Sequence, residues 1–240
     1  MEIKGIKYTA PVYDGSGYAE AARQYIQALH SLGIPLTVEP VSFEPLRPDL
    51  GEDGRVVRSL EDKKIDYNIK IMHLTTEHYH IYKEPNVFNI GYSIWETSKL
   101  HPTWPEHINE NVELAFVGCG WNVDVYKESG VEVPLFKIPH GIDVSSFDDV
   151  DDFKIAGVKK DDFVFYSVFQ WTERKHPLAL IKAYWHEFRE HEDVVLVLKT
   201  YRSSYAEQEK DIIRDTMRRM KKIMLLDDYP RILLITDMLS

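Results

Sequence analysis

Cysteine is nearly absent from this sequence, since Cys119 is the single one among 240 residues. One cysteine excludes a disulfide within the chain and is typical of proteins from reducing compartments. Long apolar runs are missing too, because no stretch approaches the roughly 20 residues that span a bilayer. The first residues, MEIKGIKYTA, also lack the apolar core of a secretory signal. We therefore expect a cytoplasmic protein, either free or at the inner face of the membrane.

Positive charge is also scarce. The 29 lysines and arginines are outnumbered by 39 acidic residues, which gives a formal net charge of −10. Affinity for nucleic acid depends mainly on neutralising phosphates, so we expect no nucleic-acid partner for such an acidic chain. An anionic ligand would have to meet a local basic site. Small ligands with concentrated charge are therefore better candidates than polymers.

What the sequence does contain is an ordinary globular composition, with 44% apolar and 28% charged residues. The first half alternates between apolar runs of strand length and stretches with helical spacing. The expected strands cover residues 3–10, 34–41, 67–75, 87–95, 113–119 and 134–143, and the expected helices 18–32, 102–111 and 122–130. Residues 44–66 have the composition of a loop with room for one short helix. This order predicts a parallel, wound α/β sheet.

An acidic stretch without periodicity, DVSSFDDVDDF (143–153), is our linker prediction. The elements expected after it are strands at 163–171, 194–201 and 231–236 and helices at 177–190 and 205–224. A wound sheet of three strands leaves large apolar faces poorly covered. We therefore expect exposed apolar surface in the second half, which would suit a homo-oligomer.

Five stretches of the chain, in this order, resemble the family 4 retaining glycosyltransferases of GT-B architecture. They are DGSGYAEAARQYIQAL, GYSIWETSKLHPTW, WNVDVYKESGVEVPLFKIPHGID, FQWTERKHPLALIKAYWHEF and VLKTY. The resemblance implies two Rossmann-like domains, of which the N-terminal one receives the acceptor and the C-terminal one holds a nucleotide-sugar donor. It also implies transfer of a hexose with retention of anomeric configuration, with neither a metal ion nor another cofactor.

On this resemblance, residues 1–145 form the acceptor domain and residues 146–240 the first part of the nucleotide-sugar domain. The family's donor domain continues with a glutamate motif that grips the ribose and the sugar, and that motif would lie beyond Ser240. The second domain is therefore expected to be incomplete, and whether this chain is active by itself stays open. The expected acceptor is a sugar, a glycan or a lipid-linked molecule.

Two adjacent cations, Arg174 and Lys175, stand where a strand turns into a helix that begins near Pro177. Free N–H groups and the helix dipole favour phosphate at such a junction. We expect these cations, with Lys199 on the next strand, to bind the donor diphosphate, and Lys175 to act on the leaving group. The family usually shows an arginine about five residues before this lysine, where Gln170 stands here. A solvated basic pair and a surface lysine are the alternatives.

Three segments of the first half supply further candidates for the site. Gly15 and Gly17 follow the first strand, where glycine lets the backbone approach a ligand and tolerates unusual dihedral angles. Glu96 stands where many family members carry a histidine, and a carboxylate there could take a proton from an acceptor hydroxyl. His140, in the turn IPHGID, is a candidate to bond the sugar or phosphate. Alternatively, the glycines form a plain turn, Glu96 caps a turn, and His140 is a packed hinge residue.

Other interpretations stay open. The glycines could belong to a dinucleotide fingerprint of an NAD-dependent oxidoreductase, with Glu39 as the ribose acid, although Glu20 is too large for the sixth position. A non-catalytic binding or regulatory module that needs a partner half is the second alternative. His73, His78 and His80 form a weak metal motif. The basic face of the long C-terminal helix could touch anionic lipid or simply be solvated.

Overall fold

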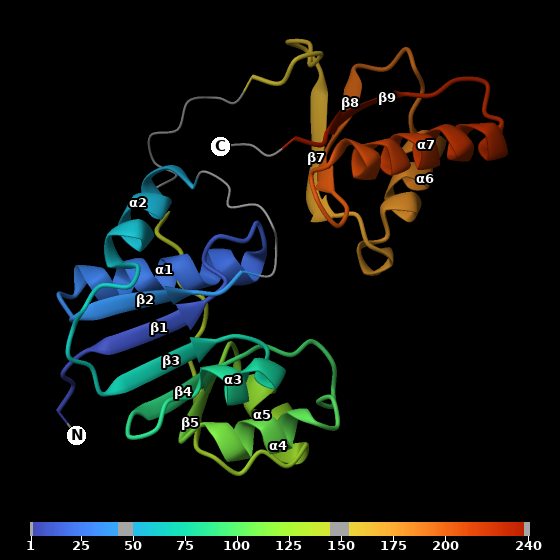
Figure 1. Cartoon of the computed structure of the whole chain (residues 1–240). Coiled ribbons are helices and arrows are strands. Elements are labelled where there is room, and N and C mark those ends of the chain that lie inside the picture. The colour runs from blue at the N-terminus through green and yellow to red at the C-terminus, as the bar shows by residue number, and fades with distance from the viewer. Residues whose placement is uncertain (1, 43–49, 145–153, 238–240) are drawn as a thin grey trace. The chain divides into compact units, whose positions relative to one another are not determined.

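The structure is a computed structural model that describes residues 2–42, 50–144 and 154–237. The chain forms two compact units, Met1–Asp149 and Val150–Leu239 (Figure 1). Each unit is built on its own parallel sheet with helices packed against it, which confirms the predicted fold class. Most of the predicted linker, residues 145–153, lies outside the described residues.

The first unit contains a six-stranded parallel sheet with the strand order β2-β1-β3-β4-β5-β6. Its strands are β1 (Ile6–Ala10), β2 (Leu36–Pro40), β3 (Ile69–His73), β4 (Phe88–Tyr92), β5 (Leu114–Val117) and β6 (Leu135–Lys137). Its helices are α1 (Gly17–Ser31), α2 (Gly51–Leu60), η1 (Thr76–His78), α3 (Tyr79–Tyr82), α4 (Trp104–Asn111) and α5 (Gly120–Glu128). The predicted elements are all present, with the strands shorter than expected and the helices displaced or shortened by one or two residues. The helices η1 and α3 lie where no helix was expected.

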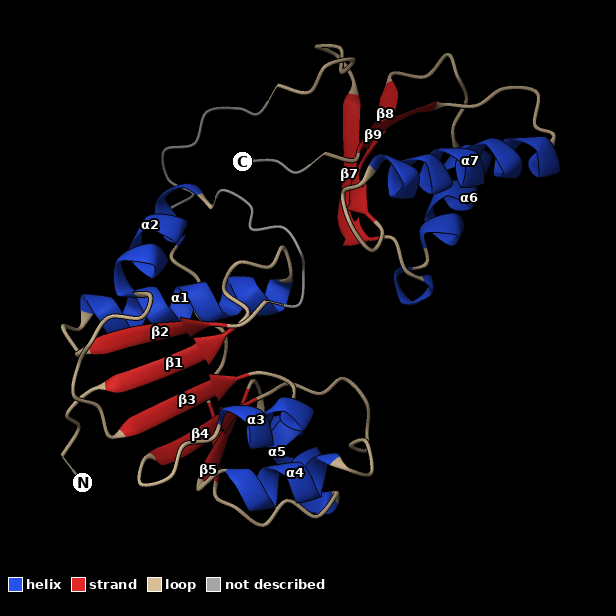
Figure 2. Ribbon diagram, viewed as in Figure 1, coloured by secondary structure: helices blue, strands red, loops and turns tan. Residues whose placement is uncertain are grey.

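Helices cover the two faces of this sheet over different strands (Figure 2). The core under α1 and α2 contains Tyr8, Ile26, Val38, Val57 and Ile71. The core under α3, α4 and α5 contains Met72, Tyr79, Ile108, Ala115 and Tyr126. The neighbours Ile71 and Met72 belong to different cores because successive side chains of a strand point to opposite faces.

Helix α1 begins and ends at signals that are visible in the sequence. The Ser16 side chain accepts a hydrogen bond from the backbone N–H of Ala19 (3.2 Å), which caps the N-terminus of the helix. Beyond the last turn, Gly33 has a φ of +72°, a left-handed conformation that glycine adopts without strain. The DGSG loop (14–17) is thereby held between the carboxyl end of β1 and the first turn of α1.

The direction of sheet growth reverses at β1, because β2 lies on one side of it and β3 on the other. In open α/β sheets, ligands bind outside the carboxyl ends of the strands at such a reversal. A ligand site in this unit is therefore expected near the ends of β1 and β3, at Ala10 and His73.

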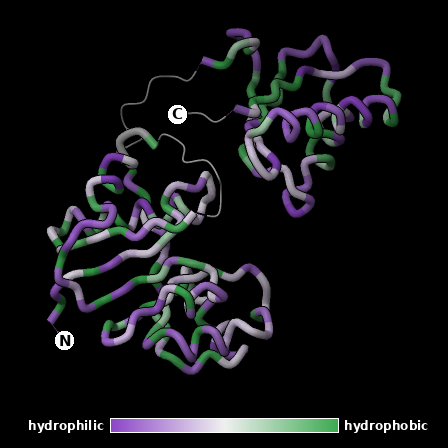
Figure 3. The backbone as a smooth tube through the Cα atoms, viewed as in Figure 1, coloured by the Kyte–Doolittle hydropathy of each residue, from purple (hydrophilic) through white to green (hydrophobic). Residues whose placement is uncertain are grey.

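The second unit contains a three-stranded parallel sheet with the order β7-β8-β9. Its elements are β7 (Phe163–Gln170), η3 (Glu173–Lys175), α6 (Pro177–Glu187), β8 (Val194–Tyr201), α7 (Glu207–Met224) and β9 (Arg231–Ile235). Hydrophilic and hydrophobic residues alternate along α7 (Figure 3). Both helices pack on one face of the sheet, as right-handed crossovers between successive neighbouring strands require. The core that they form contains Ile181, Trp185, Leu196, Leu198 and Met220.

The other face of this sheet is covered by no helix among the described residues. On the edge strand β7, Tyr166 is 78% exposed and Val168 is 71% exposed. The segment before β7 covers part of this face, because Arg231 donates to the Gly157 carbonyl (3.1 Å) and pairs with Asp162. The exposed apolar surface that we expected in the second half is present.

Candidate functional site

The carboxyl edge of the second sheet carries the cations expected to bind phosphate. Arg174 and Lys175 belong to η3, directly after β7, and both are exposed. The next residue, His176, has a φ of +52°, and Pro177 then starts α6. Proline suits this position because the first N–H of a helix has no partner within the helix. Both cations therefore stand at the junction of strand and helix, as predicted.

The loops after β7 and β8 run side by side. The Trp171 N–H donates to the Tyr201 carbonyl (2.7 Å). The side-chain amide of Gln170 donates to the Arg202 carbonyl (2.9 Å). Lys199 lies near the end of β8, so it shares this edge with the two cations that follow β7.

Lys199 is half-buried and has an aromatic neighbour. Its Nζ lies 5.0 Å from the centroid of the Tyr205 ring. Burial lowers the pKa of the Lys199 ammonium, and the charge of Asp237 opposes that effect. A cation that has lost part of its water gains from meeting an anion, so this edge suits a ligand that carries phosphate.

In the first unit, Gly15 lies in the loop at the sheet reversal, and Gly17 is the first residue of α1. Gly17 is exposed, and a Cβ added to it would meet no atom within 4 Å. Its φ does not lie in the positive region, unlike that of Gly33 or Gly130. An unusual backbone conformation is therefore not the reason for glycine at position 17. Close approach to a ligand is the property that this open position offers.

Glu96 is exposed in the segment that follows β4. Asn122 of α5 donates to the carbonyl of the preceding residue, Trp95 (2.8 Å). The Trp95 indole N–H in turn donates to the Lys99 carbonyl (2.7 Å). These contacts hold the backbone on both sides of Glu96. Glu96 itself stays exposed at the carboxyl edge of the first sheet.

His140 lies beyond β6 at the same edge. The Tyr25 hydroxyl is 2.8 Å from the Pro139 carbonyl, and the Tyr92 hydroxyl is 3.2 Å from the Ile138 carbonyl. The imidazole centroid of His140 lies 6.2 Å from the Tyr25 ring and 6.0 Å from the Tyr92 ring. Burial lowers the pKa of His140, which favours a neutral imidazole that can both donate and accept a hydrogen bond.

The structure adds His73 to the candidate site. This residue is fully buried, with its Nδ1 2.9 Å from the Tyr8 hydroxyl and its ring 4.5 Å from that of Tyr18 and 4.3 Å from that of Tyr92. Burial, and then the charge of His140, lowers the pKa of His73 to about 3, so its imidazole is neutral at physiological pH. Its Nε2 has no hydrogen-bond partner among the described residues. In the sequence, His73 is one member of a weak metal motif, and its place at the end of a strand is the signal that it could reach the site.

The metal motif does not assemble. In the described part of the chain, no group of three His, Cys, Asp or Glu side chains is placed to hold a metal ion. The Nδ1 of His78 lies 3.0 Å from the Thr75 hydroxyl instead, and the His80 ring lies 6.5 Å from that of His107. That the reaction needs neither metal nor cofactor stays a prediction.

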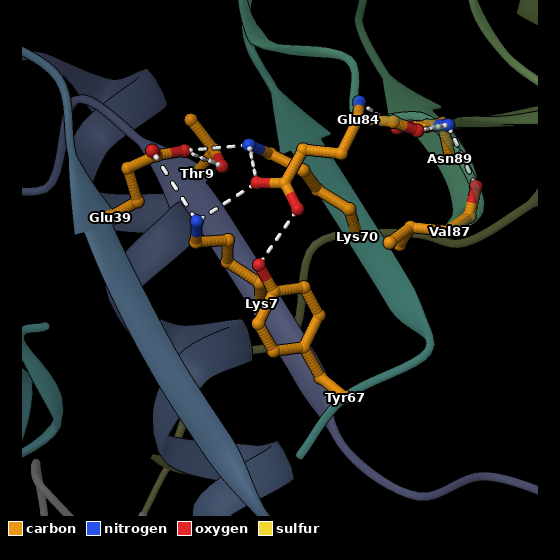
Figure 4. Close-up of polar contacts among 8 residues, drawn as sticks. All are labelled: Lys7, Thr9, Glu39, Tyr67, Lys70, Glu84, Val87 and Asn89. Carbon is orange, nitrogen blue, oxygen red and sulfur yellow. Dashed lines mark hydrogen bonds and ion pairs between the residues drawn. The ribbon is translucent and has the colours of Figure 1, made fainter. Parts of the chain in front are cut away.

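Glu39, the acid of the dinucleotide alternative, belongs to a charged network on the sheet (Figure 4). It accepts hydrogen bonds from Thr9 (2.7 Å) and Lys70 (2.8 Å). Lys70 and Lys7 also donate to Glu84, at 2.8 and 2.9 Å. Glu39 is thus engaged in joining β1, β2 and β3.

The basic residues of α7 are interleaved with acidic ones. Arg214 contacts Glu207 (3.3 Å) and Asp211 (3.0 Å), and Arg218 contacts Asp215 (2.8 Å). Such pairs offset much of the positive charge on this helix, which weakens its attraction to anionic lipid. As for spanning a bilayer, none of the described helices combines the required length with the required apolarity.

Compared by sequence, the chain matches no protein-family model and no curated protein. Compared by structure, it is similar to solved α-glucosyltransferases. One of them, in complex with UDP and a 13-mer DNA containing an HMU base, has a TM-score of 0.58 and 10% identity, over 98% of this chain and 68% of that chain. A second, in complex with UDP, has a TM-score of 0.53 and 12% identity, over 97% and 68%. A third, in complex with UDP-glucose and DNA containing an abasic site, has a TM-score of 0.55 and 11% identity, over 97% and 67%.

The fold is that of a GT-B-type glycosyltransferase. This similarity concerns the fold, and it gives no support to the oxidoreductase alternative. The chain spans about two thirds of the length of these solved chains, and the described part of its second sheet has three strands, consistent with a partial second domain.

The exclusion of nucleic-acid partners from the net charge is wrong. Several of the similar glucosyltransferase structures are complexes with DNA. Net charge sums over the whole surface, whereas a nucleic acid meets one local face of a protein. A formal charge of −10 is therefore no ground for excluding DNA from a protein of this fold.

Proposed function

We propose that this chain acts as a glycosyltransferase that moves a hexose from a nucleotide-sugar to an acceptor, with retention of configuration and without a metal ion. In this proposal residues 1–145 receive the acceptor and residues 146–240 hold the donor. The observation that carries it is the set of cations Arg174, Lys175 and Lys199 on the carboxyl edge of one parallel sheet. The similar structures contain UDP or UDP-glucose, and a diphosphate is the ligand that such an edge suits.

The reaction builds negative charge where these cations lie. The bond that breaks joins the anomeric carbon of the sugar to an oxygen of the diphosphate, and that oxygen keeps the bonding electrons. Cations placed in advance stabilise this charge more in the transition state than in the bound donor. A charge-assisted hydrogen bond from Lys175 contributes about 1.5–3 kcal/mol, and Arg174 and Lys199 hold the remaining phosphate oxygens.

The first unit supplies the groups proposed to act on the acceptor. Glu96 is proposed to accept the proton of the attacking hydroxyl, for which its exposure after β4 is suitable. His140 is proposed to hydrogen-bond the sugar or a phosphate. Gly15 and Gly17 are proposed to let the ligand pass close to the backbone, which the open space around Gly17 supports.

We propose DNA as the first acceptor to test, because similar glucosyltransferases have been solved in complex with DNA. A sugar, a glycan and a lipid-linked molecule are the other acceptors. Incubation of the purified chain with radiolabelled UDP-glucose and duplex DNA containing an HMU base would measure the transfer. Labelled glucose is expected on the DNA both with and without EDTA. NMR of the product is expected to show an α linkage. An EDTA-sensitive reaction or a β linkage would contradict the metal-free or the retaining part of the proposal.

Donor binding can be tested separately by calorimetric titration with UDP and UDP-glucose. Lys175→Ala is expected to weaken UDP binding roughly tenfold to a hundredfold. Lys182→Ala is the matched control, because Lys182 is an exposed lysine further along α6 and should leave the affinity unchanged. Unchanged UDP affinity in the Lys175 variant would refute the diphosphate site.

The non-catalytic alternative gives a different pattern. A binding module would take up UDP-glucose, depend on Lys175 and yet transfer no label to any acceptor. For the enzyme, Glu96→Gln should keep UDP affinity and lose most of the transfer rate, since the amide cannot take a proton. Full transfer by the Glu96 variant would remove this residue from the proposed mechanism.

A further inference from the structure

The surroundings of Lys199 differ from those of an ordinary surface lysine. The register of β7 and β8 places it opposite Val168, on the sheet face that α6 and α7 leave uncovered. No carboxylate lies within ion-pair distance of Lys199 in the described part of the chain. The charge of Asp237 raises the pKa of Lys199, but the Asp237 carboxylate is paired with Lys210 at 2.6 Å.

Two tyrosines take the place that a carboxylate would have. The Lys199 Nζ lies 5.0 Å from the centroid of the Tyr205 ring, within the range of a cation–π contact. The Tyr205 ring is itself stacked on the Tyr201 ring, with centroids 4.9 Å apart and an interplanar angle of 23°. Tyr201 is the last residue of β8, so the stack ties the loop residue Tyr205 to the end of the strand.

This arrangement suits an ammonium group that must be held for an incoming anion. An aromatic ring attracts the cation without neutralising it, whereas a carboxylate would compete with a phosphate for the same charge. A lysine has a long, flexible stem, and ordering that stem before the ligand arrives lowers the entropic cost of binding. The ring therefore fixes the direction of Lys199 and leaves its charge available.

We propose that Tyr205 is a positioning residue that holds the Lys199 ammonium at the carboxyl edge of the second sheet, ready to contact a phosphate of the donor. This inference rests on the proposed function, because it assigns to Lys199 a diphosphate ligand. Tyr205 acts through Lys199 and needs no contact with the ligand.

The same unit contains a matched contact in another place. Lys221 lies 4.7 Å from the centroid of the Tyr229 ring and 5.5 Å from that of Trp185. It belongs to the last turn of α7, which precedes β9 and so lies toward the amino ends of the strands. Lys221→Ala therefore removes a cation–π contact of the same kind without touching the carboxyl edge.

The test is a double-mutant cycle in the whole chain, with UDP and inorganic pyrophosphate as ligands and calorimetry as the measurement. Lys199→Ala is expected to weaken binding of both ligands roughly tenfold to a hundredfold. Tyr205→Leu is expected to weaken it roughly two- to fivefold, while Tyr205→Phe, which keeps the ring, binds as the unmodified chain does. In the Lys199→Ala background, Tyr205→Leu should have no further effect. Lys221→Ala should leave both affinities unchanged.

The outcomes separate this inference from the proposed function. Equal losses for the Leu and Phe variants, or an additive effect of Tyr205→Leu without Lys199, would overturn the positioning role and leave the diphosphate site standing. If the unmodified chain bound neither ligand, or Lys199→Ala bound both normally, the role of Lys199 and this inference would fall together. Circular dichroism melting of each variant shows whether it is folded. If Tyr205→Leu does not fold, Tyr205→Phe is the variant that is compared with the unmodified chain.

Discussion

Lys7 and Lys70 on the first sheet are held by carboxylates, whereas Lys199 at the edge of the second sheet is held against an aromatic ring. Lys70 in β3 is only 2% exposed and contacts Glu39 and Glu84 at 2.8 Å each. Lys199 in β8 is half-buried and faces Tyr205. In the first setting two carboxylates neutralise the lysine, whereas in the second the aromatic ring attracts the ammonium and leaves its charge unneutralised.

In the first unit, paired charges lie on a part of the sheet that α1 and α2 do not cover. Lys7, Lys70, Glu39 and Glu84 neutralise one another on the face of β1, β2 and β3 that α1 and α2 do not cover, and the Tyr67 hydroxyl donates to Glu84 (2.7 Å; Figure 4). Burying such charges is costly unless each has a close opposite partner. The second sheet instead leaves apolar residues exposed on its uncovered face.

The largest effect that would test this comparison is expected from Lys70→Met. Removing the buried ammonium leaves Glu39 and Glu84 with one lysine between them, and breaking a buried pair costs about 3–5 kcal/mol of unfolding free energy. Lys4→Met is the control, since Lys4 and Asp66 form an exposed pair at 3.5 Å that contributes about 0–1 kcal/mol. Urea denaturation followed by circular dichroism measures both. A loss for Lys70→Met no larger than that for Lys4→Met would show that the network is not structural.

The next effect concerns the uncovered face of the second sheet. Val197 on the central strand is 3% exposed, and Val197→Ala should cost about 2 kcal/mol. Val168 lies on the same face of the edge strand and is largely exposed, so Val168→Ala should cost less than about 0.5 kcal/mol. The same denaturation experiment compares them. Similar losses at both positions would mean that this face is covered in solution, for example by a second copy.

A smaller effect is expected from the ends of helices. In the first unit, glycines follow α1 and α5 in left-handed conformations, with φ of +72° at Gly33 and +102° at Gly130. In the second unit, Leu225 takes this role after α7, with φ of +49° and an exposed side chain. Leu225→Gly should raise the unfolding free energy by about 0.5–1 kcal/mol, because glycine has no Cβ to strain. Leu32→Gly, at an exposed position with φ of −77°, should give no gain.

A further difference between the two units concerns pH dependence. Burial opposes ionisation of Glu84, but hydrogen bonds from Lys7, Lys70 and Tyr67 outweigh it and lower its pKa to about 2. A carboxyl whose pKa is lower in the folded state stabilises the fold above its ordinary pKa of 4.5, and that contribution is lost as the pH falls toward about 2. Glu84→Gln should lose less stability than the unmodified chain over this range. Parallel curves of stability against pH would show that Glu84 is not the group responsible.

Much of the fold could be predicted because it depends on local patterns. Alternating and helical spacings of apolar residues located the longer strands and helices. The place of Arg174 and Lys175 at a strand-to-helix junction followed from Pro177 and the apolar run before it. The helices η1 and α3 were not predicted, because each is too short to show the helical spacing of apolar residues.

Other features depended on contacts that no local pattern contains. His73 meets Tyr8, a residue 65 positions earlier, because β1 and β3 are neighbours in the sheet. Lys70 meets Glu39 for the same reason of strand order. The prediction about nucleic acid failed because a net charge says nothing about where on a surface the charges lie.

By itself, the sequence determined the longer strands and helices, that the sheets are parallel, and that cations stand where a strand meets a helix. Only the tertiary structure decided that Lys199 lies over the Tyr205 ring, that four charges neutralise one another on the first sheet, and that His73 is buried among tyrosines. The physical reason is distance along the chain. Local conformation depends on neighbours within a few residues, whereas burial, charge pairing and pKa depend on which strands the fold places side by side.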